Sequence, residues 1–258
     1  MIDYIEANFA TYEEMDRQLF LLGPVAFAEN REQQRGVGST SMASFTMCRE
    51  CQQEYDNPLD RRFDAQPNAC PVCGPQLRLL DPQGQELAGD PVLTAANLLR
   101  EGAVIAVKGL GGFHLACLAT DDTAVGRLRE RKRRPHKALA VMFADLDAAR
   151  QHCRINEWEE AEMLSVARPI VILGRRPRST LSALISPDTH DIGAFLPYTP
   201  LHHLLLAQVA PLVMTSANFA EEPIASTLDE LKCLIGTVAD YVLDHDRPIV
   251  RRCDDSVV

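Results

Sequence analysis

The chain has 258 residues, of which 46% are hydrophobic, and its formal net charge at pH 7 is −10. This length suits one or two domains, and this hydrophobic content is enough for a packed core. The negative charge argues against a protein dedicated to nucleic acid, because neutralising phosphates needs a basic face. The sequence has no apolar run of about eighteen residues, so no membrane span is expected.

The first forty residues form an acidic lead-in to which the sequence assigns no role. Residues 1–6 have neither the basic start nor the apolar stretch of a secretory signal, so we expect a cytoplasmic protein. Residues 11–14 read Thr-Tyr-Glu-Glu, which fits a capping box at the start of a helix. The glycine- and serine-rich residues 36–41 then predict a flexible connector.

Four cysteines follow in the pattern C-x2-C-x18-C-x2-C, at Cys48, Cys51, Cys70 and Cys73. Two close pairs about twenty residues apart are typical of a tetrahedral zinc site. Two disulfides or four unrelated thiols are the alternatives, but a reducing cytosol favours metal binding. Because four thiolates leave no open position, the pattern predicts structural zinc. The segment 41–85 has little apolar periodicity, so its fold should depend on the metal.

From Pro91 onward, patterns typical of helices and strands alternate, which predicts a layered α/β domain over residues 90–258. One expected helix starts at Asp121 or Asp122, and another has Thr199 as its N-cap and Pro200 in its first turn. Expected strands lie at 104–107, 139–143, 169–173, 211–215, 241–243 and 248–250, and expected helices at 93–99, 121–132 and 199–206.

A glycine-rich segment, residues 108–114, directly follows the first of these strands. It matches neither the phosphate loop nor G-x-G-x-x-G, since His114 stands at the last glycine position. Its glycines would let backbone approach a ligand, with Lys108 and His114 adding polar reach. A tight turn with no ligand is the alternative.

Residues 127–137 are strongly basic although the chain as a whole is acidic. Charge runs are usually solvated helix faces. This run, however, passes Pro135 and leads into the strand expected at Leu139, and ligands of α/β sheets bind at such strand ends. Cations there would neutralise a polyphosphate, and double-stranded RNA is the second partner considered.

Three further groups of residues invite interpretation. Residues 215–218 close a strand with hydroxyl and amide groups that suit either a ligand or a turn. Residues 254–256 suit either a magnesium ion or a polar loop. His202 and His203, next to leucines in a helix, are interpreted as structural, and the cysteines outside the quartet as small core residues. Those cysteines are Cys117, Cys153, Cys233 and Cys253.

Together these segments resemble the HypF family of hydrogenase maturation carbamoyltransferases, in its zinc-finger region and its YrdC-like domain. The resemblance covers residues 41–258. It is carried by residues 45–75, 107–117, 128–134, 196–203, 215–218, 222–224 and 247–258.

The resemblance implies a YrdC-like twisted mixed sheet with flanking helices, preceded by a small four-cysteine zinc-finger segment. It implies that ATP and carbamate, supplied by carbamoyl phosphate, form carbamoyl adenylate and release pyrophosphate, with Mg2+ expected. The carbamoyl group then passes to a cysteine of a HypE-type maturation protein and becomes the cyanide ligand of a nickel–iron centre.

The same resemblance implies a set of site residues. They are the phosphate-facing Lys132, Arg134 and Lys137, the nucleotide-binding Ser216 and Asn218, Lys108 and His114 towards the carbamoyl end, and Arg251 and Ser256 in the closing pocket motif.

The sequence also departs from this family. Residues 1–40 lack the family's acylphosphatase segment, one cysteine quartet stands where two are usual, and the sequence stops at Val258, where the family continues into a transferase domain. Leu118, Ala138 and Ala220 replace the usual acidic residue, proline and serine. We therefore expect the middle of a larger enzyme, carrying at most the adenylation half. The alternatives are threonylcarbamoyl adenylate synthesis for tRNA modification, an RNA-binding or scaffold module, and a folded fragment without turnover.

Overall fold

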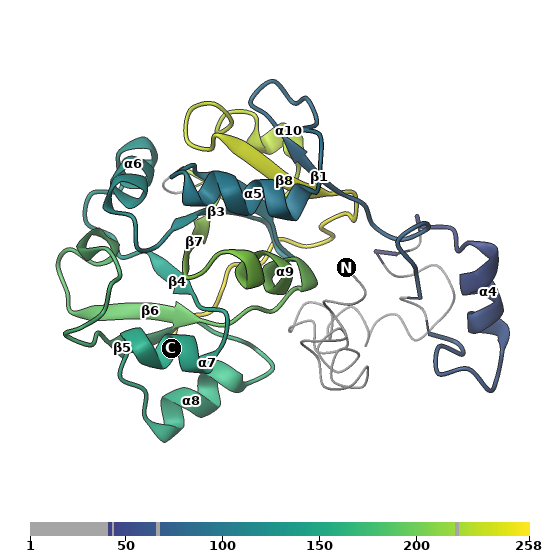
Figure 1. The fold of residues 1–258 in the computed structure, drawn as a ribbon, viewed down its shortest axis with the longest axis horizontal. Coiled ribbons are helices and arrows are strands. Elements are labelled where there is room, and N and C mark those ends of the chain that lie inside the picture. Colours follow the sequence, from purple (N-terminus) through teal and green to yellow (C-terminus); the bar gives the residue numbers. More distant parts are fainter. Residues whose placement is uncertain (1–40, 43, 66–67, 220–221) are drawn as a thin grey trace.

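A mixed sheet of eight strands forms the centre of the structure, a computed structural model that describes residues 41–42, 44–65, 68–219 and 222–258 (Figure 1). The lead-in, its capping box, most of the connector and Ala220 lie outside the described residues. The strands are β1 (Leu77–Leu80), β2 (Ile105–Lys108), β3 (Phe113–Leu118), β4 (Ala140–Met142), β5 (Val171–Gly174), β6 (Asp191–Phe195), β7 (Leu212–Ser216) and β8 (Tyr241–His245).

The strand order is β1-β8-β2-β3-β7-β4-β6-β5. Strands β2 and β8 are parallel, as are β4 and β6, and the other neighbours are antiparallel. The YrdC-like mixed sheet with flanking helices is therefore confirmed. Strand β1 lies within the range expected for the finger, yet it pairs with β8 of the central sheet.

Helices cover both faces of this sheet. Helices α5 (Pro91–Arg100) and α9 (Pro200–Gln208) pack against each other on one face, as Figure 1 shows. The residues of the other face form a core with α6 (Asp122–Lys132), α7 (Leu146–His152), α8 (Glu157–Leu164), α10 (Leu228–Leu231) and the 3-10 helix η1 (Ala183–Ile185).

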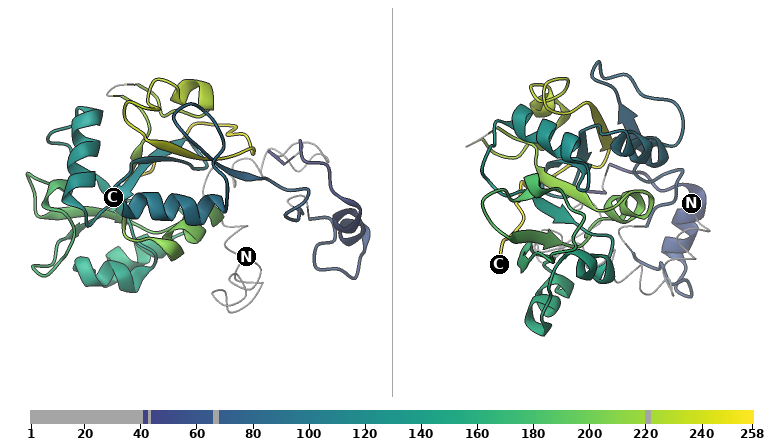
Figure 2. Two further views of the ribbon diagram at one scale, coloured as in Figure 1. Left: turned by 45° about the horizontal axis from the view of Figure 1, so that its top comes forward. Right: turned by 60° about the vertical axis from the view of Figure 1, so that its left-hand side comes forward.

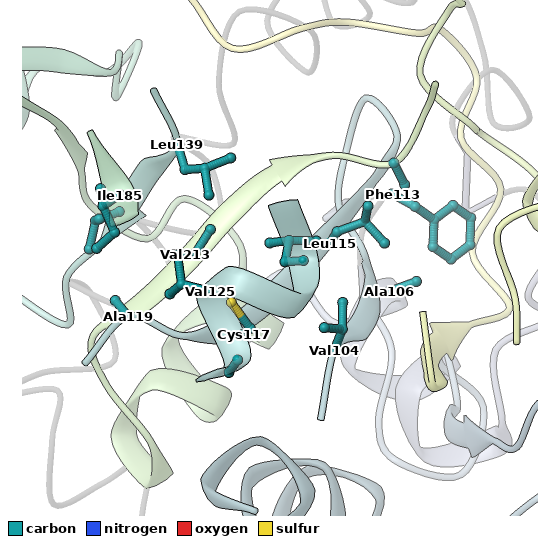
Figure 3. Packing of buried hydrophobic residues seen from close by; sticks show 14 of the residues in the cluster. Val104, Ala106, Phe113, Leu115, Cys117, Ala119, Val125, Leu139, Ile185 and Val213 are labelled. Carbon is teal, nitrogen blue, oxygen red and sulfur yellow. The ribbon is translucent and has the colours of Figure 1, made fainter. Parts of the chain in front are cut away.

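Alternation along the strands divides the buried side chains between two cores. In β3, Leu115 and Cys117 belong to the core beneath α6, whereas Ala116 belongs to the core beneath α5 and α9. Figure 3 shows the first of these cores, with Leu115, Cys117 and Val213 close together. Successive side chains of a strand point to opposite faces of the sheet. The position of a polar residue along its strand therefore determines the face on which its side chain lies.

The four-cysteine segment carries helix α4 (Arg49–Asp56) and lies beside the sheet domain rather than over it, as both views of Figure 2 also show. It connects to β1 through residues 74–76. The backbone N–H of Gln76 donates to Asp246 across 2.8 Å, which holds the connection against the chain after β8.

Most expected elements are confirmed, including the helix caps Asp121 and Thr199. The strand expected at 248–250 is wrong, because this stretch has no ladder partner and its Val250 is exposed. Strands β1, β3 and β6 and helices α4, α7, α8 and α10 were not predicted from the sequence. Cys117 and Cys153 are buried as expected, but Cys233 and Cys253 are exposed and not core residues. None of the described helices combines the length and apolar character needed to cross a membrane.

Candidate functional site

The polar residues that end β2, begin β3 and end β7 gather at one end of the sheet. The antiparallel ladders pair Lys108 with Phe113 and His114 with Ser216, so all four residues lie at this end. Ligands of α/β proteins bind outside the carboxyl ends of strands. These strand ends therefore form the candidate ligand-binding end of the sheet.

Lys132, the last residue of α6, points into the end of β7. It is 3% exposed, and its Nζ donates to the backbone carbonyl oxygens of Ser216 and Asn218, the latter at 3.0 Å. It also lies 3.1 Å from Oδ1 of Asn218, which accepts from Ser216 Oγ at 2.8 Å. Arg133, in the left-handed conformation with φ 51°, then ends the helix. Lys132, Ser216 and Asn218 thus form one connected group.

Two more cations adjoin this group. Arg134 Nη1 donates to Thr215 Oγ1 at 3.3 Å, and burial lowers the pKa of Arg134. Burial, followed by the charges of Arg134 and Lys137, lowers the pKa of Lys132 to about 7. Lys137 itself is exposed. An anion arriving here would favour the charged form of Lys132, as a polyphosphate site requires.

Arg129 stabilises the loop after α6. The sequence did not distinguish this residue from its neighbours in the basic run. It is 7% exposed, and its guanidinium donates to backbone carbonyls on both sides of the loop after α6. The accepting oxygens belong to Leu184, Ile185, Arg134, Pro135 and Lys137. Arg129 therefore fixes the loop that carries Arg134 and Lys137, two of the three phosphate-facing candidates.

Two more residues of the basic run have partners within the protein. Arg131 forms an ion pair with Asp240 at 2.8 Å, and His136 lies 3.1 Å from Asp188. With Arg129 and Lys132 buried, the run does not present one continuous cationic face to solvent.

The glycines of the turn at residues 109–112 leave room for neighbouring segments of the protein. The Gly109 N–H donates to the Gly112 carbonyl at 2.8 Å and closes a tight turn. A Cβ on Gly111 would lie 2.8 Å from the Cβ of Cys253, and one on Gly112 would lie 2.5 Å from Ile224. Among the described residues, these two glycines admit neighbouring protein segments.

Lys108 and His114 lie on opposite faces of the sheet. Lys108 shares a face with Phe113, and its Nζ lies 5.7 Å from the centre of that ring. Nζ also donates to the carbonyl of His245 at 2.6 Å and pairs with Asp244 at 3.1 Å. The structure therefore separates these two candidates and gives Lys108 a buried ionic environment.

His114 belongs to the face covered by α9. Its Nε2 lies 3.1 Å from Asp255 Oδ2, and its ring centre is 6.1 Å from that of His202. Burial alone would raise the pKa of Asp255, but hydrogen bonds from His114 and Tyr198 bring it below its usual value. Asp255, for which the sequence suggested a magnesium ion or a polar loop, lies in a segment without helix or strand and pairs with His114.

The remaining two candidates lie on the same C-terminal segment, which runs from β8 to β5 (Figure 1). Arg251 and Ser256 are both exposed. The Ser256 carbonyl accepts from the Ile170 N–H at 2.8 Å, which attaches the segment to the start of β5. The described contacts bring Asp255, rather than its neighbour Ser256, to the end of the sheet.

The cysteine quartet forms a second candidate site. The Sγ–Sγ distances are 3.7 Å for Cys48–Cys70, 3.8 Å for Cys70–Cys73 and 3.7 Å for Cys51–Cys73. A tetrahedron with metal–sulfur bonds of about 2.3 Å has edges of about 3.8 Å, so the four thiols fit zinc. A Cβ on Gly74 would lie 2.9 Å from the carbonyl oxygen of Cys70, so the turn that presents the second pair needs glycine there.

Two family models match this sequence. The model described as "Telomere recombination", which covers the Sua5, YciO and YrdC proteins, matches residues 97–258. The model described as "HypF finger" matches residues 47–80. The two matches lie over the sheet domain and the cysteine segment.

Known proteins resemble the chain over both parts. It is 49% identical over 220 residues to carbamoyltransferase HypF of Rhodobacter capsulatus, covering 85% of this chain and 29% of that protein. A crystal structure of full-length HypF in the phosphate- and nucleotide-bound form has a TM-score of 0.81 at 42% identity, covering 87% of this chain and 29% of that one. Threonylcarbamoyl-AMP synthase of Escherichia coli is 30% identical over 167 residues, covering 60% of this chain and 85% of that protein.

The chain thus spans less than a third of the HypF relatives that it matches, and most of the much shorter synthase. The family match extends over more than half of the chain and includes every strand except β1. The chain therefore belongs to the Sua5–YciO–YrdC family, and it carries the HypF finger ahead of that family's domain.

Proposed function

We propose that this chain forms carbamoyl adenylate from ATP and carbamate, as the adenylation part of a HypF-type carbamoyltransferase for hydrogenase maturation. The observation that carries the proposal is the combination of a HypF finger with a sheet domain similar to that of nucleotide-bound HypF. Carbamoyl phosphate would be the source of the carbamate, and a HypE-type protein in the cytoplasm the final acceptor.

The proposed reaction is a nucleotidyl transfer. A carbamate oxygen attacks the α-phosphorus of ATP, the bond between the α-phosphorus and the bridging oxygen breaks, and pyrophosphate leaves with that oxygen. Negative charge grows on the pyrophosphate, so fixed cations at the phosphates stabilise the transition state.

We assign the phosphate contacts to Lys132, Arg134 and Lys137, and the nucleotide contacts to Ser216 and Asn218. The contacts among Lys132, Ser216 and Asn218 support this assignment, because they hold the Lys132 amine at the end of β7 before any ligand arrives. Mg2+ would arrive with the ATP phosphates, whose oxygens are its usual ligands in such sites.

We assign Arg251 and Ser256 to closure of the site by the C-terminal segment. The bond from Cys253 N–H to the Gly111 carbonyl, 3.1 Å long, supports this role because it ties that segment to the glycine turn.

The finger would hold a structural zinc ion through Cys48, Cys51, Cys70 and Cys73. The tetrahedral fit of the sulfur distances supports this assignment. Zinc would supply folding energy to a segment with few buried apolar side chains, and no chemistry.

The similarity to threonylcarbamoyl-AMP synthase makes threonylcarbamoyl adenylate the second candidate product. The match to the HypF finger and the higher identity to HypF favour carbamate. Double-stranded RNA is less well supported, because Arg129, Arg131 and Lys132 are engaged inside the protein.

The test is ATP–pyrophosphate exchange by zinc-loaded protein, with carbamate in one arm and threonine plus bicarbonate in the other. Exchange that requires carbamate, and that Lys132→Met abolishes, is the expected result. Lys232→Met is the matched control, because Lys232 is an exposed lysine that pairs with Asp229, and neither residue is a site candidate. Exchange only with threonine would replace the proposal by the synthase function, and no exchange despite ATP binding would overturn it for this chain.

A further inference from the structure

One ring nitrogen of His114 has no partner in the described part of the chain, although it is buried. Nδ1 of His114 is enclosed and accepts or donates no hydrogen bond, and the residue is 5% exposed. An unpaired buried polar atom is unfavourable, so such an atom in a native structure calls for an explanation. A ligand that pairs with it when bound is one explanation.

Asp255 determines which nitrogen of the neutral His114 ring carries the proton. An ionised carboxylate only accepts hydrogen bonds, so Asp255 requires the proton of His114 to be on Nε2, 3.1 Å away. Tyr198 contributes a further hydrogen bond to the same carboxylate. In a neutral imidazole with its proton on Nε2, Nδ1 is an acceptor, and its partner must bring a hydrogen.

The position of His114 places this acceptor next to the nucleotide group. His114 is paired with Ser216 in the ladder of β3 and β7, and neighbouring strands are about 4.8 Å apart. A Cβ on Gly109 would lie 3.2 Å from Nδ1, so the nearest turn on that side presents no side chain. Glycine at this position therefore keeps a side chain away from Nδ1, beside the strand end that carries Ser216.

We infer that Asp255 and Tyr198 are positioning residues that hold His114 with Nδ1 as an acceptor for the N–H of the carbamoyl group. The inference rests on the proposed function and adds to it a basis for selecting carbamate. Carbamate has an amino group to donate, whereas acetate, of similar size, has none. The shape of a carboxylate alone does not separate the two.

The first test replaces the positioning carboxylate. Asp255→Asn removes the charge that fixes the proton on Nε2, while Asp254→Asn is a matched control at the exposed neighbouring residue. We expect kcat/KM for carbamate to fall about 10- to 100-fold in Asp255→Asn, as for loss of a hydrogen bond in a buried site, with ATP affinity unchanged. Tyr198→Phe should cause a smaller loss.

The second test uses two amides in place of the imidazole and does not depend on the fold tolerating Asp255→Asn. The short amide of His114→Asn puts its oxygen near the position of Nδ1, whereas the longer amide of His114→Gln reaches the position of Nε2. His114→Asn should therefore retain clearly more carbamate-dependent exchange than His114→Gln. Equal loss in both, or equal kinetics of Asp255→Asn and Asp254→Asn, would overturn the inference.

A direct readout is the nitrogen NMR spectrum of histidine-labelled protein, which distinguishes the two neutral tautomers. His114 should carry its proton on Nε2 in the wild type and lose this preference in Asp255→Asn. A proton on Nδ1 in the wild type would also overturn the inference. If the wild type shows the expected tautomer but no carbamate-dependent exchange, the proposed function fails while the positioning by Asp255 stands.

Discussion

Replacing Asp244 by asparagine should destabilise the fold more than its single charge suggests, because this carboxylate neutralises two cations. Asp244 is 1% exposed and accepts from Arg78 at 2.7 Å through Oδ2, while its Oδ1 lies 3.1 Å from Lys108 Nζ. The Arg78 side chain is 41% exposed and can turn to water, but that of Lys108 is 10% exposed and cannot. The substitution therefore leaves Lys108 as an uncompensated buried charge.

Removing one partner of a buried ion pair costs about 3–5 kcal/mol, whereas exposed pairs contribute about 0–1 kcal/mol. Since Arg78 is partly exposed and asparagine keeps one hydrogen bond, we expect Asp244→Asn to lower the free energy of unfolding by about 3 kcal/mol. Arg78→Met should lower it by about 1 kcal/mol or less. Urea denaturation followed by circular dichroism measures both values.

A double variant identifies the cause. Asp244→Asn combined with Lys108→Met should be more stable than Asp244→Asn alone, because the second change removes the uncompensated cation. If the two losses simply add, or if Asp244→Asn costs no more than Arg78→Met, the reasoning about a shared buried carboxylate is wrong.

Four further outcomes are expected. Chelating zinc should unfold the cysteine segment and leave the sheet domain folded. Limited proteolysis followed by mass spectrometry would detect this difference. If segment 45–75 stayed resistant to protease after chelation, the zinc would not be structural. Because burial lowers the pKa of Lys132 to about 7 while an unfolded lysine titrates near 10.4, the unfolded chain binds more protons between these pH values. The free energy of unfolding should therefore rise with pH across that window, and Lys132→Met should remove this rise. ATP binding at pH 8 should take up about one proton, which calorimetry detects as a binding heat that depends on the buffer. A binding heat that does not depend on the buffer would place Lys132 away from the phosphates. Asn218→Ala should weaken ATP binding about 5- to 100-fold through loss of its contacts with Ser216 and Lys132, and unchanged affinity would move the nucleotide site elsewhere.

The parts of this protein that could be predicted from sequence are those in which the chemistry is local. The cysteine quartet follows from spacing alone, and Asp121 and Thr199 cap the helices directly after them. The family resemblance supplied the mixed sheet and the set of site residues, but not how these residues contact one another.

Contacts between distant segments could not be predicted. Strand β3 was missed because burial on both faces removes the alternation that identifies a strand, and the polar His114 stands near its start. Without β3 there was no ladder from which to see that Lys108 and His114 face opposite sides. Asp255 is 141 residues from His114 in sequence, so no local pattern connects the two.

The path of the C-terminal segment has a consequence for how the protein is made. Strands β2 and β3 leave the ribosome well before β8, which pairs with β2, and before Asp255, which pairs with His114. Until those residues emerge, the nascent chain exposes one unpaired edge of β2, and such edges are prone to pair with other chains. The growing chain should therefore depend on chaperones most between the synthesis of β3 and that of β8, and His114 acquires its fixed proton only after the whole sheet has been translated.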